Sequence, residues 1–112
     1  MGPEELLSDA MLAGGHGGVN GGANVHPQPY VALYDAAVRG DMARVRELHR
    51  EVLRFSETLY RIGRHPSAII KGIKCALSLR GICDDFMAEP FHRFREKERQ
   101  QVRDALAALE LA

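Results

Sequence analysis

At 112 residues the chain has the length of one domain, and a chain of this size can bury enough surface to fold alone. Its 15 basic residues are balanced by 15 acidic ones, so no net charge attracts nucleic acid or an anionic membrane. Acidic Glu4 and Glu5 stand where a secretory signal has basic residues, no apolar run can span a bilayer, and Cys75 and Cys83 lack the paired spacing of zinc sites. These features predict a cytoplasmic protein that binds neither nucleic acid nor membrane.

The chain opens with a predicted helix over residues 1–13. Pro3 suits the first turn of a helix, and the glycine pair Gly14-Gly15 ends it. The next residues, 14–22, read GGHGGVNGG and include six glycines. We expect a short strand over residues 16–20, because glycine lets a buried strand lie close to its neighbours. A single strand forms no sheet, so its partners must come from another copy or another piece of chain.

Four further helices are predicted beyond the glycines. Prolines 27 and 29 delay the first until about residue 30, and it ends at Gly40. Asp41 caps a long helix whose apolar residues recur every three or four positions up to Gly63. A helix from Ser67 to Gly81 follows, and the last runs from about residue 94 to 109. The sequence thus predicts a mainly helical chain with one glycine-rich strand.

The glycine cluster matches no phosphate-binding motif. Gly15, Gly17 and Gly18 do not fit the dinucleotide pattern G-x-G-x-x-G, and Gly17 to Gly22 is followed by Ala23-Asn24 where a P-loop has Lys-Ser/Thr. His16 and His26 flank the cluster, but no third strong metal ligand is close in sequence. The sequence therefore predicts neither a metal site nor a cofactor.

No catalytic group stands out either. The four serines lie in helical or capping contexts, and no G-x-S-x-G motif is present. Lys71, Lys74 and Lys97 all fall in predicted helices, where an exposed position is more common than the desolvated pocket that a Schiff-base lysine needs. We therefore predict no catalytic residue within the chain.

Five features, in order, resemble the C-terminal part of the dihydrodipicolinate synthase / N-acetylneuraminate lyase family. They are the glycine-rich run of residues 14–25, Gly40-Asp41 before a long helix, residues 66–77 (PSAIIKGIKCAL), Gly81-Ile82 and Pro90-Phe91. The resemblance implies part of a TIM (β/α)8 barrel, in which residues 1–40 are helix 7, strand 8 and helix 8, and residues 41–112 form a C-terminal helical domain. It also implies assembly into oligomers.

Members of that family form a Schiff base between a lysine and pyruvate or a similar 2-oxo acid. The resemblance implies that this lysine and the proton-relaying tyrosine lie on earlier strands. It carries over Val19 as a substrate-binding residue, where the last strand passes the keto-acid pocket; Asn20 stands where many relatives have a small polar residue.

Two hypotheses follow. The first is the C-terminal portion of a class I aldolase-type lyase, inactive alone and dependent on another copy or a complementary chain for the missing strands. The alternative is a non-catalytic helical module that binds partners through exposed apolar stripes. Whether the chain is an enzyme stays open at this point.

Overall fold

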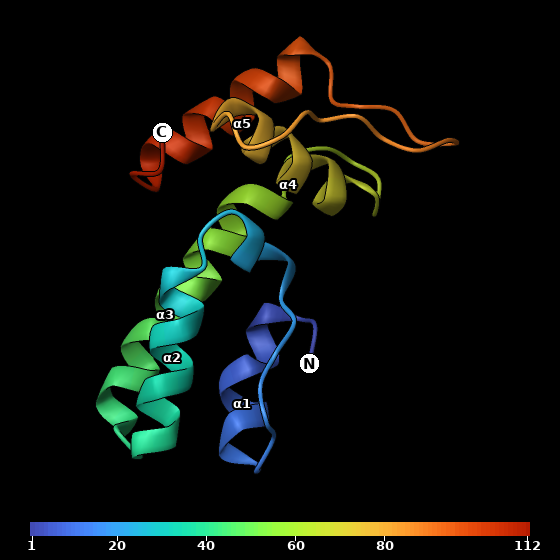
Figure 1. Ribbon diagram of the computed structural model, residues 1–112. Coiled ribbons are helices and arrows are strands. Elements are labelled where there is room, and N and C mark those ends of the chain that lie inside the picture. Colours follow the sequence, from blue (N-terminus) through green and yellow to red (C-terminus); the bar gives the residue numbers. More distant parts are fainter. The chain divides into compact units, whose positions relative to one another are not determined.

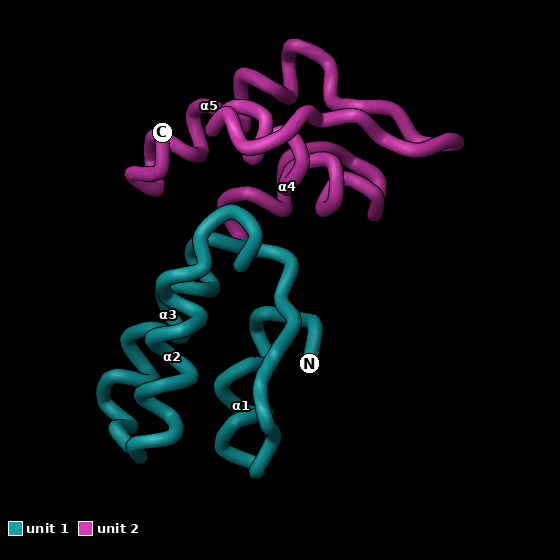
Figure 2. The backbone as a smooth tube through the Cα atoms, in the orientation of Figure 1, with its two compact units in different colours: residues 1–56 teal, residues 57–112 magenta.

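The computed structural model describes all 112 residues, and its regular elements are all helices. Along the chain they are η1 (Glu4–Leu6), α1 (Leu7–Leu12), η2 (Gly21–Asn24), α2 (Gln28–Arg39), α3 (Met42–Tyr60), α4 (Ala68–Leu79) and α5 (Glu96–Ala108), as labelled in Figure 1. The chain forms two compact units, unit 1 over residues 1–56 and unit 2 over residues 57–112 (Figure 2). The predicted division at residue 40 separates barrel from appended domain, and it stays a prediction.

The predicted helices are confirmed, and local signals explain their ends. Gly40 ends α2 in the left-handed conformation, with φ of 73°, which glycine adopts without steric cost. Asp41 caps α3, since its carboxylate accepts a hydrogen bond from the backbone N–H of Arg44 at 3.2 Å. Gly81 follows α4 with φ of 75°. None of the helices is both long enough and apolar enough to cross a membrane.

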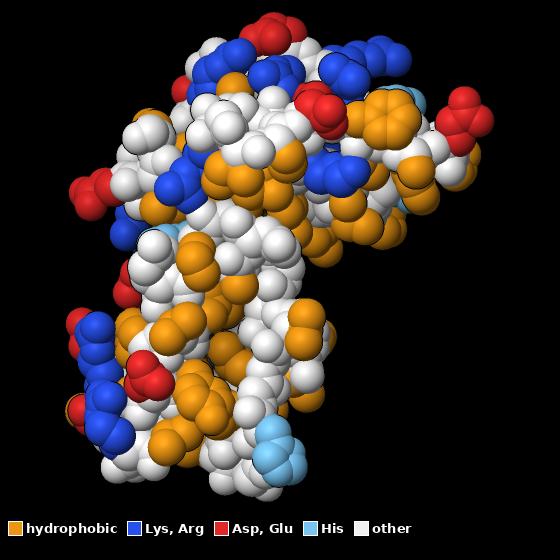
Figure 3. Space-filling model, viewed as in Figure 1, with side chains coloured by type: hydrophobic (Ala, Val, Ile, Leu, Met, Phe, Trp, Pro, Cys, Tyr) orange, Lys and Arg blue, Asp and Glu red, His pale blue; other side chains and the backbone are white.

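The core of unit 1 is formed by three helices. Leu7 of α1 and Leu33 of α2 are buried together with Val45, Leu48 and Val52 of α3, which recur at steps of three and four and so share one face. Burying each such side chain stabilises a fold by about 1.5–3 kcal/mol. Hydrophobic side chains also reach the surface of this unit (Figure 3).

Unit 2 is built on the contact between α4 and α5. Cys75 of α4 and Val102 of α5 are fully buried, and burial raises the pKa of the Cys75 thiol. Cys83, by contrast, is exposed. The buried carboxylate of Asp85 lies 2.6 Å from the Arg99 guanidinium and 3.4 Å from that of Arg93. Two opposite charges compensate for the removal of this carboxylate from water.

The strand predicted over residues 16–20 is wrong for this chain, because these residues form a loop with no strand pairing. Asn20 does have extended backbone angles, with φ of −90° and ψ of 135°. A strand, however, is completed by a neighbour that pairs with its N–H and C=O groups, and no neighbouring strand is present in these 112 residues. The backbone N–H of Val19 instead donates to the carbonyl of Met1, at 2.8 Å.

Candidate functional site

The candidate site is the glycine-rich segment, residues 14–24, together with the side chains that hold it. Glu4 of η1 is buried, and its carboxylate accepts a hydrogen bond of 2.6 Å from the backbone N–H of Gly22. The two residues are 18 positions apart, so this bond ties the start of the chain to the segment. A hydrogen bond to an ionised carboxylate is about twice as strong as one between neutral groups.

Glycine is required at position 22 by close packing. A Cβ atom there would lie 2.6 Å from the Phe55 ring and 3.0 Å from the Glu4 carboxylate, and it would also collide with the Tyr30 hydroxyl. Gly18 is exposed but crowded on one side, because a Cβ there would lie 2.8 Å from Leu7 and 2.6 Å from the Asn20 side chain. The backbone of the segment therefore packs directly against side chains from η1, α1, α2 and α3.

The Tyr30 hydroxyl is the buried polar group next to this packing. It makes no hydrogen bond of standard geometry, although the Glu4 carboxylate is near enough to interact with it. Burial, followed by the negative charge of Glu4 and the contact with its carboxylate, raises the pKa of Tyr30 well above its ordinary value. The hydroxyl thus keeps its proton at alkaline pH values at which an exposed tyrosine would lose it.

Val19, which the family resemblance places by the keto-acid pocket, and its neighbour Asn20 have opposite environments. Asn20 is buried, and its side-chain amide donates to the carbonyl of Gly2 at 2.7 Å. Val19 is 89% exposed. An apolar side chain so exposed, on a backbone otherwise held in place, is available to a neighbour from outside unit 1. The role of Val19 in substrate binding stays a prediction.

A hollow of about 270 Å³ adjoins the segment, lined in part by Gly17, Gly18, Asn20 and Tyr30. No group of three or more metal-ligating side chains occurs in the chain. His16 is exposed, while His26 lies 3.0 Å from the Gln28 amide oxygen and 3.7 Å from the Glu51 carboxylate. The hollow is lined mainly by apolar side chains, among them Leu7 and Val31, with backbone, amide and phenol groups beside them, so it can shape a ligand site but supplies no nucleophile.

The three lysines lie outside this site. Lys71 and Lys74 are on α4 and Lys97 is on α5, all in unit 2. Lys74 donates a hydrogen bond of 2.5 Å to the carbonyl of Phe86. None of them lines the hollow beside the glycine-rich segment.

Sequence reasoning missed Glu4 as a structural anchor. The sequence showed Glu4 only as an acidic residue near the start of the chain, whereas its carboxylate reaches across to Gly22. The pair Gly21-Gly22 was a signal for close packing, but nothing in the sequence shows which side chain approaches it.

Comparison with solved structures places this arrangement in the TIM-barrel class. Dihydrodipicolinate synthase from Bacteroides thetaiotaomicron matches with a TM-score of 0.91 and 51% identity, over 96% of this chain and 36% of that one. A prophage protein of Escherichia coli from the dihydrodipicolinic acid synthase family, solved in complex with pyruvate, matches with a TM-score of 0.82 and 27% identity, over 99% of this chain and 36% of that one. The chain thus has the fold of one part of a TIM barrel, although it contains no strand itself.

The family follows from the sequence comparisons. The model of the dihydrodipicolinate synthetase family matches residues 1–109, so the chain belongs to that family. The 4-hydroxy-tetrahydrodipicolinate synthase of Natronomonas pharaonis is 35% identical over 97% of this chain and 35% of its own length. The chain spans about a third of the length of the relatives that it matches. The resemblance seen in the sequence is thereby confirmed.

Proposed function

We propose that this chain supplies the C-terminal part of a Schiff-base-forming lyase or synthase that acts on pyruvate or a similar 2-oxo acid. The observation that carries the proposal is the match of nearly the whole chain to 4-hydroxy-tetrahydrodipicolinate synthases. The structure solved with pyruvate supports the choice of substrate class.

The chain is inactive alone in this proposal, since the family's Schiff-base lysine belongs to an earlier strand. Lys71, Lys74 and Lys97 are helical residues of unit 2, remote in sequence from the glycine-rich segment. Strands that carry the lysine must therefore come from outside these 112 residues. The glycine-rich segment becomes the last barrel strand when a neighbouring strand supplies its hydrogen-bonding partners.

Val19 is the residue that this assembly covers. Its side chain is exposed in the free chain, and in the completed barrel it borders the 2-oxo acid. A branched apolar side chain there excludes water and shapes the pocket around the substrate. Asn20 stays buried against the first residues and orients the segment.

Reconstitution tests the proposal. The chain is co-expressed with the complementary N-terminal part of the synthase from Bacteroides thetaiotaomicron, treated with pyruvate and borohydride, and weighed by mass spectrometry. A pyruvyl adduct is expected on the supplied N-terminal part and none on this chain. A stable adduct on Lys71, Lys74 or Lys97 of the isolated chain would overturn the proposal.

A helical interaction module is the second candidate, and one observation favours it. Val31, Tyr34 and Val38 are exposed apolar residues that lie three and four positions apart on α2 and form a stripe.

Two variants separate these candidates. Val19→Asp blocks reconstitution if the glycine-rich segment joins a barrel, because the charge would then be buried without a partner. Val38→Asp leaves reconstitution intact in that case. The reverse pattern of effects favours the module.

A further inference from the structure

Unit 2 contains a hollow of about 350 Å³ between the loop after α3, the beginning of α4 and the beginning of α5. Five cationic side chains line it, against the single carboxylate of Glu98. We call this hollow the basic pocket; its cations are Arg64, Lys71, Arg93, Arg95 and Lys97. The concentration is notable in a chain with equal numbers of acidic and basic residues. Figure 3 shows Lys and Arg side chains close together on unit 2.

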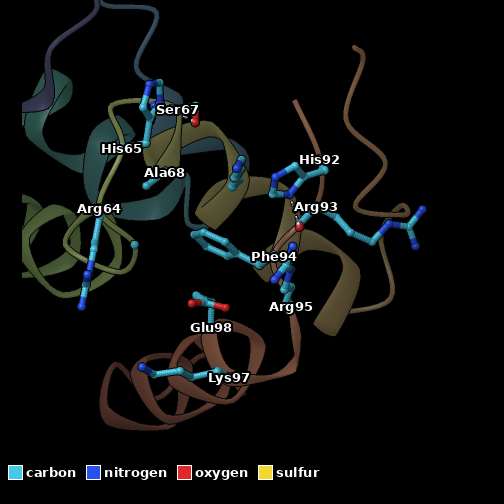
Figure 4. A pocket seen from close by; sticks show the side chains of 12 residues that line it. Arg64, His65, Ser67, Ala68, His92, Arg93, Phe94, Arg95, Lys97 and Glu98 are labelled. Atoms are coloured by element: carbon cyan, nitrogen blue, oxygen red, sulfur yellow. Dashed lines mark hydrogen bonds between the residues drawn. The ribbon is translucent and has the colours of Figure 1, made fainter. Parts of the chain in front are cut away.

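Most of these cations have no acidic partner within the chain. Arg93 extends away from the centre of the pocket, and its guanidinium lies 3.4 Å from Asp85 (Figure 4). The other four form no ion pair. Elsewhere in unit 2, Arg99 and Arg103 are each paired with a carboxylate. Like charges gathered without counter-ions repel one another, and a bound anion removes that repulsion.

The beginning of α5 adds backbone donors to the same pocket. At the beginning of α4 the donors are already engaged, since the N–H groups of Ala68 and Lys71 donate to the carbonyls of His65 and Ser67 at 2.8 and 3.1 Å. Ser67 and Arg95 precede α4 and α5, and neither makes a side-chain capping bond. The Ser67 hydroxyl is hydrogen-bonded to Nδ1 of His65 instead, at 2.9 Å. First-turn N–H groups have no partner within their own helix, and the positive end of the helix dipole favours negative charge. The first-turn N–H groups of α5 and the helix dipole therefore favour an anion, as the cationic side chains do.

The floor of the pocket is closely packed. The Phe94 ring is buried and lies between Ala68 of α4 and Glu98 of α5 (Figure 4). Gly63, at the edge, has φ of 92°, and a Cβ there would lie 2.8 Å from Ala68. The packed floor gives the pocket a defined shape between α4 and α5.

We propose that the basic pocket binds a small phosphate-bearing anion. Arginine guanidinium groups donate paired hydrogen bonds that match the geometry of phosphate oxygens. The volume is near the lower end of the range for small-molecule sites, so the ligand is small. A nucleic acid fits less well, because the cations gather around a hollow and the whole chain has no net positive charge.

Calorimetric titration with inorganic pyrophosphate tests the site, at fixed ionic strength and with citrate as the carboxylate comparison. The combined variant Arg64→Gln and Arg95→Gln should raise the dissociation constant for pyrophosphate about tenfold or more, as expected for the loss of a charge-assisted hydrogen bond. The matched control, Arg46→Gln and Arg50→Gln, removes the same charge from exposed positions of α3 in unit 1. It should leave the dissociation constant unchanged.

Three outcomes would overturn the proposal. They are equal losses of affinity in both double variants, tighter binding of citrate than of pyrophosphate, and no binding to the unaltered chain. A fourth outcome, tighter binding of a short DNA duplex that both variants weaken equally, would also overturn it by showing a nonspecific polyanion surface. Each titration uses the whole chain without a complementary part, so the result is independent of barrel reconstitution.

Discussion

Substituting Gly22 with alanine perturbs the centre of the candidate site. The new methyl group would lie 2.6 Å from the Phe55 ring and 3.0 Å from the Glu4 carboxylate, and it would collide with the Tyr30 hydroxyl. All three neighbours are buried, so none can turn into solvent. Overpacking of this kind costs about 1–3 kcal/mol.

The same substitution strains the hydrogen bond between the Gly22 N–H and Glu4. That bond measures 2.6 Å, and its loss would leave a buried carboxylate undersatisfied. Adding part of this loss to the packing cost, we expect Gly22→Ala to destabilise unit 1 by about 2–4 kcal/mol. With a urea dependence of about 1–3 kcal/mol per molar, the unfolding midpoint should fall by about 1–2 M.

Urea unfolding followed by far-ultraviolet circular dichroism measures the effect, and hydrogen exchange in α1 and α2 locates it in unit 1. Gly2→Ala is the matched control, because a Cβ at residue 2 meets no atom within 4 Å. That control should unfold like the unaltered chain. If Gly22→Ala also lies within about 0.5 kcal/mol of it, the range of ordinary surface substitutions, the packing argument is refuted.

Three further predictions concern exchange, pH and a buried ion pair. Amides of residues 44–59 and 68–79 should exchange slowly and those of the glycine-rich segment quickly, apart from hydrogen-bonded ones such as Gly22. Because the pKa of Tyr30 is raised, the folded chain keeps this proton after the unfolded chain loses it, so unfolding free energy should fall above about pH 10. Asp85→Asn should destabilise unit 2 by about 3–5 kcal/mol, because it leaves Arg99 without its buried partner.

These three predictions can each be contradicted by a measurement. Equal protection of the glycine-rich segment and α3 would contradict the exchange prediction. Tyr30→Phe should reduce the loss of stability at alkaline pH to the part that the buried Cys75 thiol contributes, and a loss unchanged in this variant would assign it to another group. Glu96→Gln removes an exposed carboxylate from Arg103 and should cost much less than Asp85→Asn; equal costs would show that burial of Asp85 has little effect.

Local signals made the helices predictable from sequence. Gly40 and Asp41 marked the end of α2 and the cap of α3, and both act as expected. The glycine-rich segment was different, since periodicity and glycine content indicate a strand only when partner strands exist. Here the carbonyl of Met1 takes the place of one such partner.

The candidate site was less predictable. Val19 was predicted as a substrate-binding residue from the family resemblance alone. Its exposure in this chain could not be predicted from the neighbouring residues in the sequence. The contact between Glu4 and Gly22 joins residues 18 apart, a pairing that helical periodicity does not encode. The basic pocket brings together residues 63–71 and 92–98 of unit 2, which are separated in sequence by the rest of α4 and the loop after it, so the balanced overall composition gave no sign of it.

The bond from the Val19 N–H to the Met1 carbonyl has a practical consequence for anyone who labels this protein. The Asn20 side chain also donates to the carbonyl of Gly2, so the first two residues are already engaged along the glycine-rich segment. A purification tag or fluorophore fused ahead of Met1 would begin directly beside Val19 and compete with any incoming chain. A tag after Ala112 avoids this contact, because it is attached to an exposed residue of unit 2 and not to the residues that hold the segment.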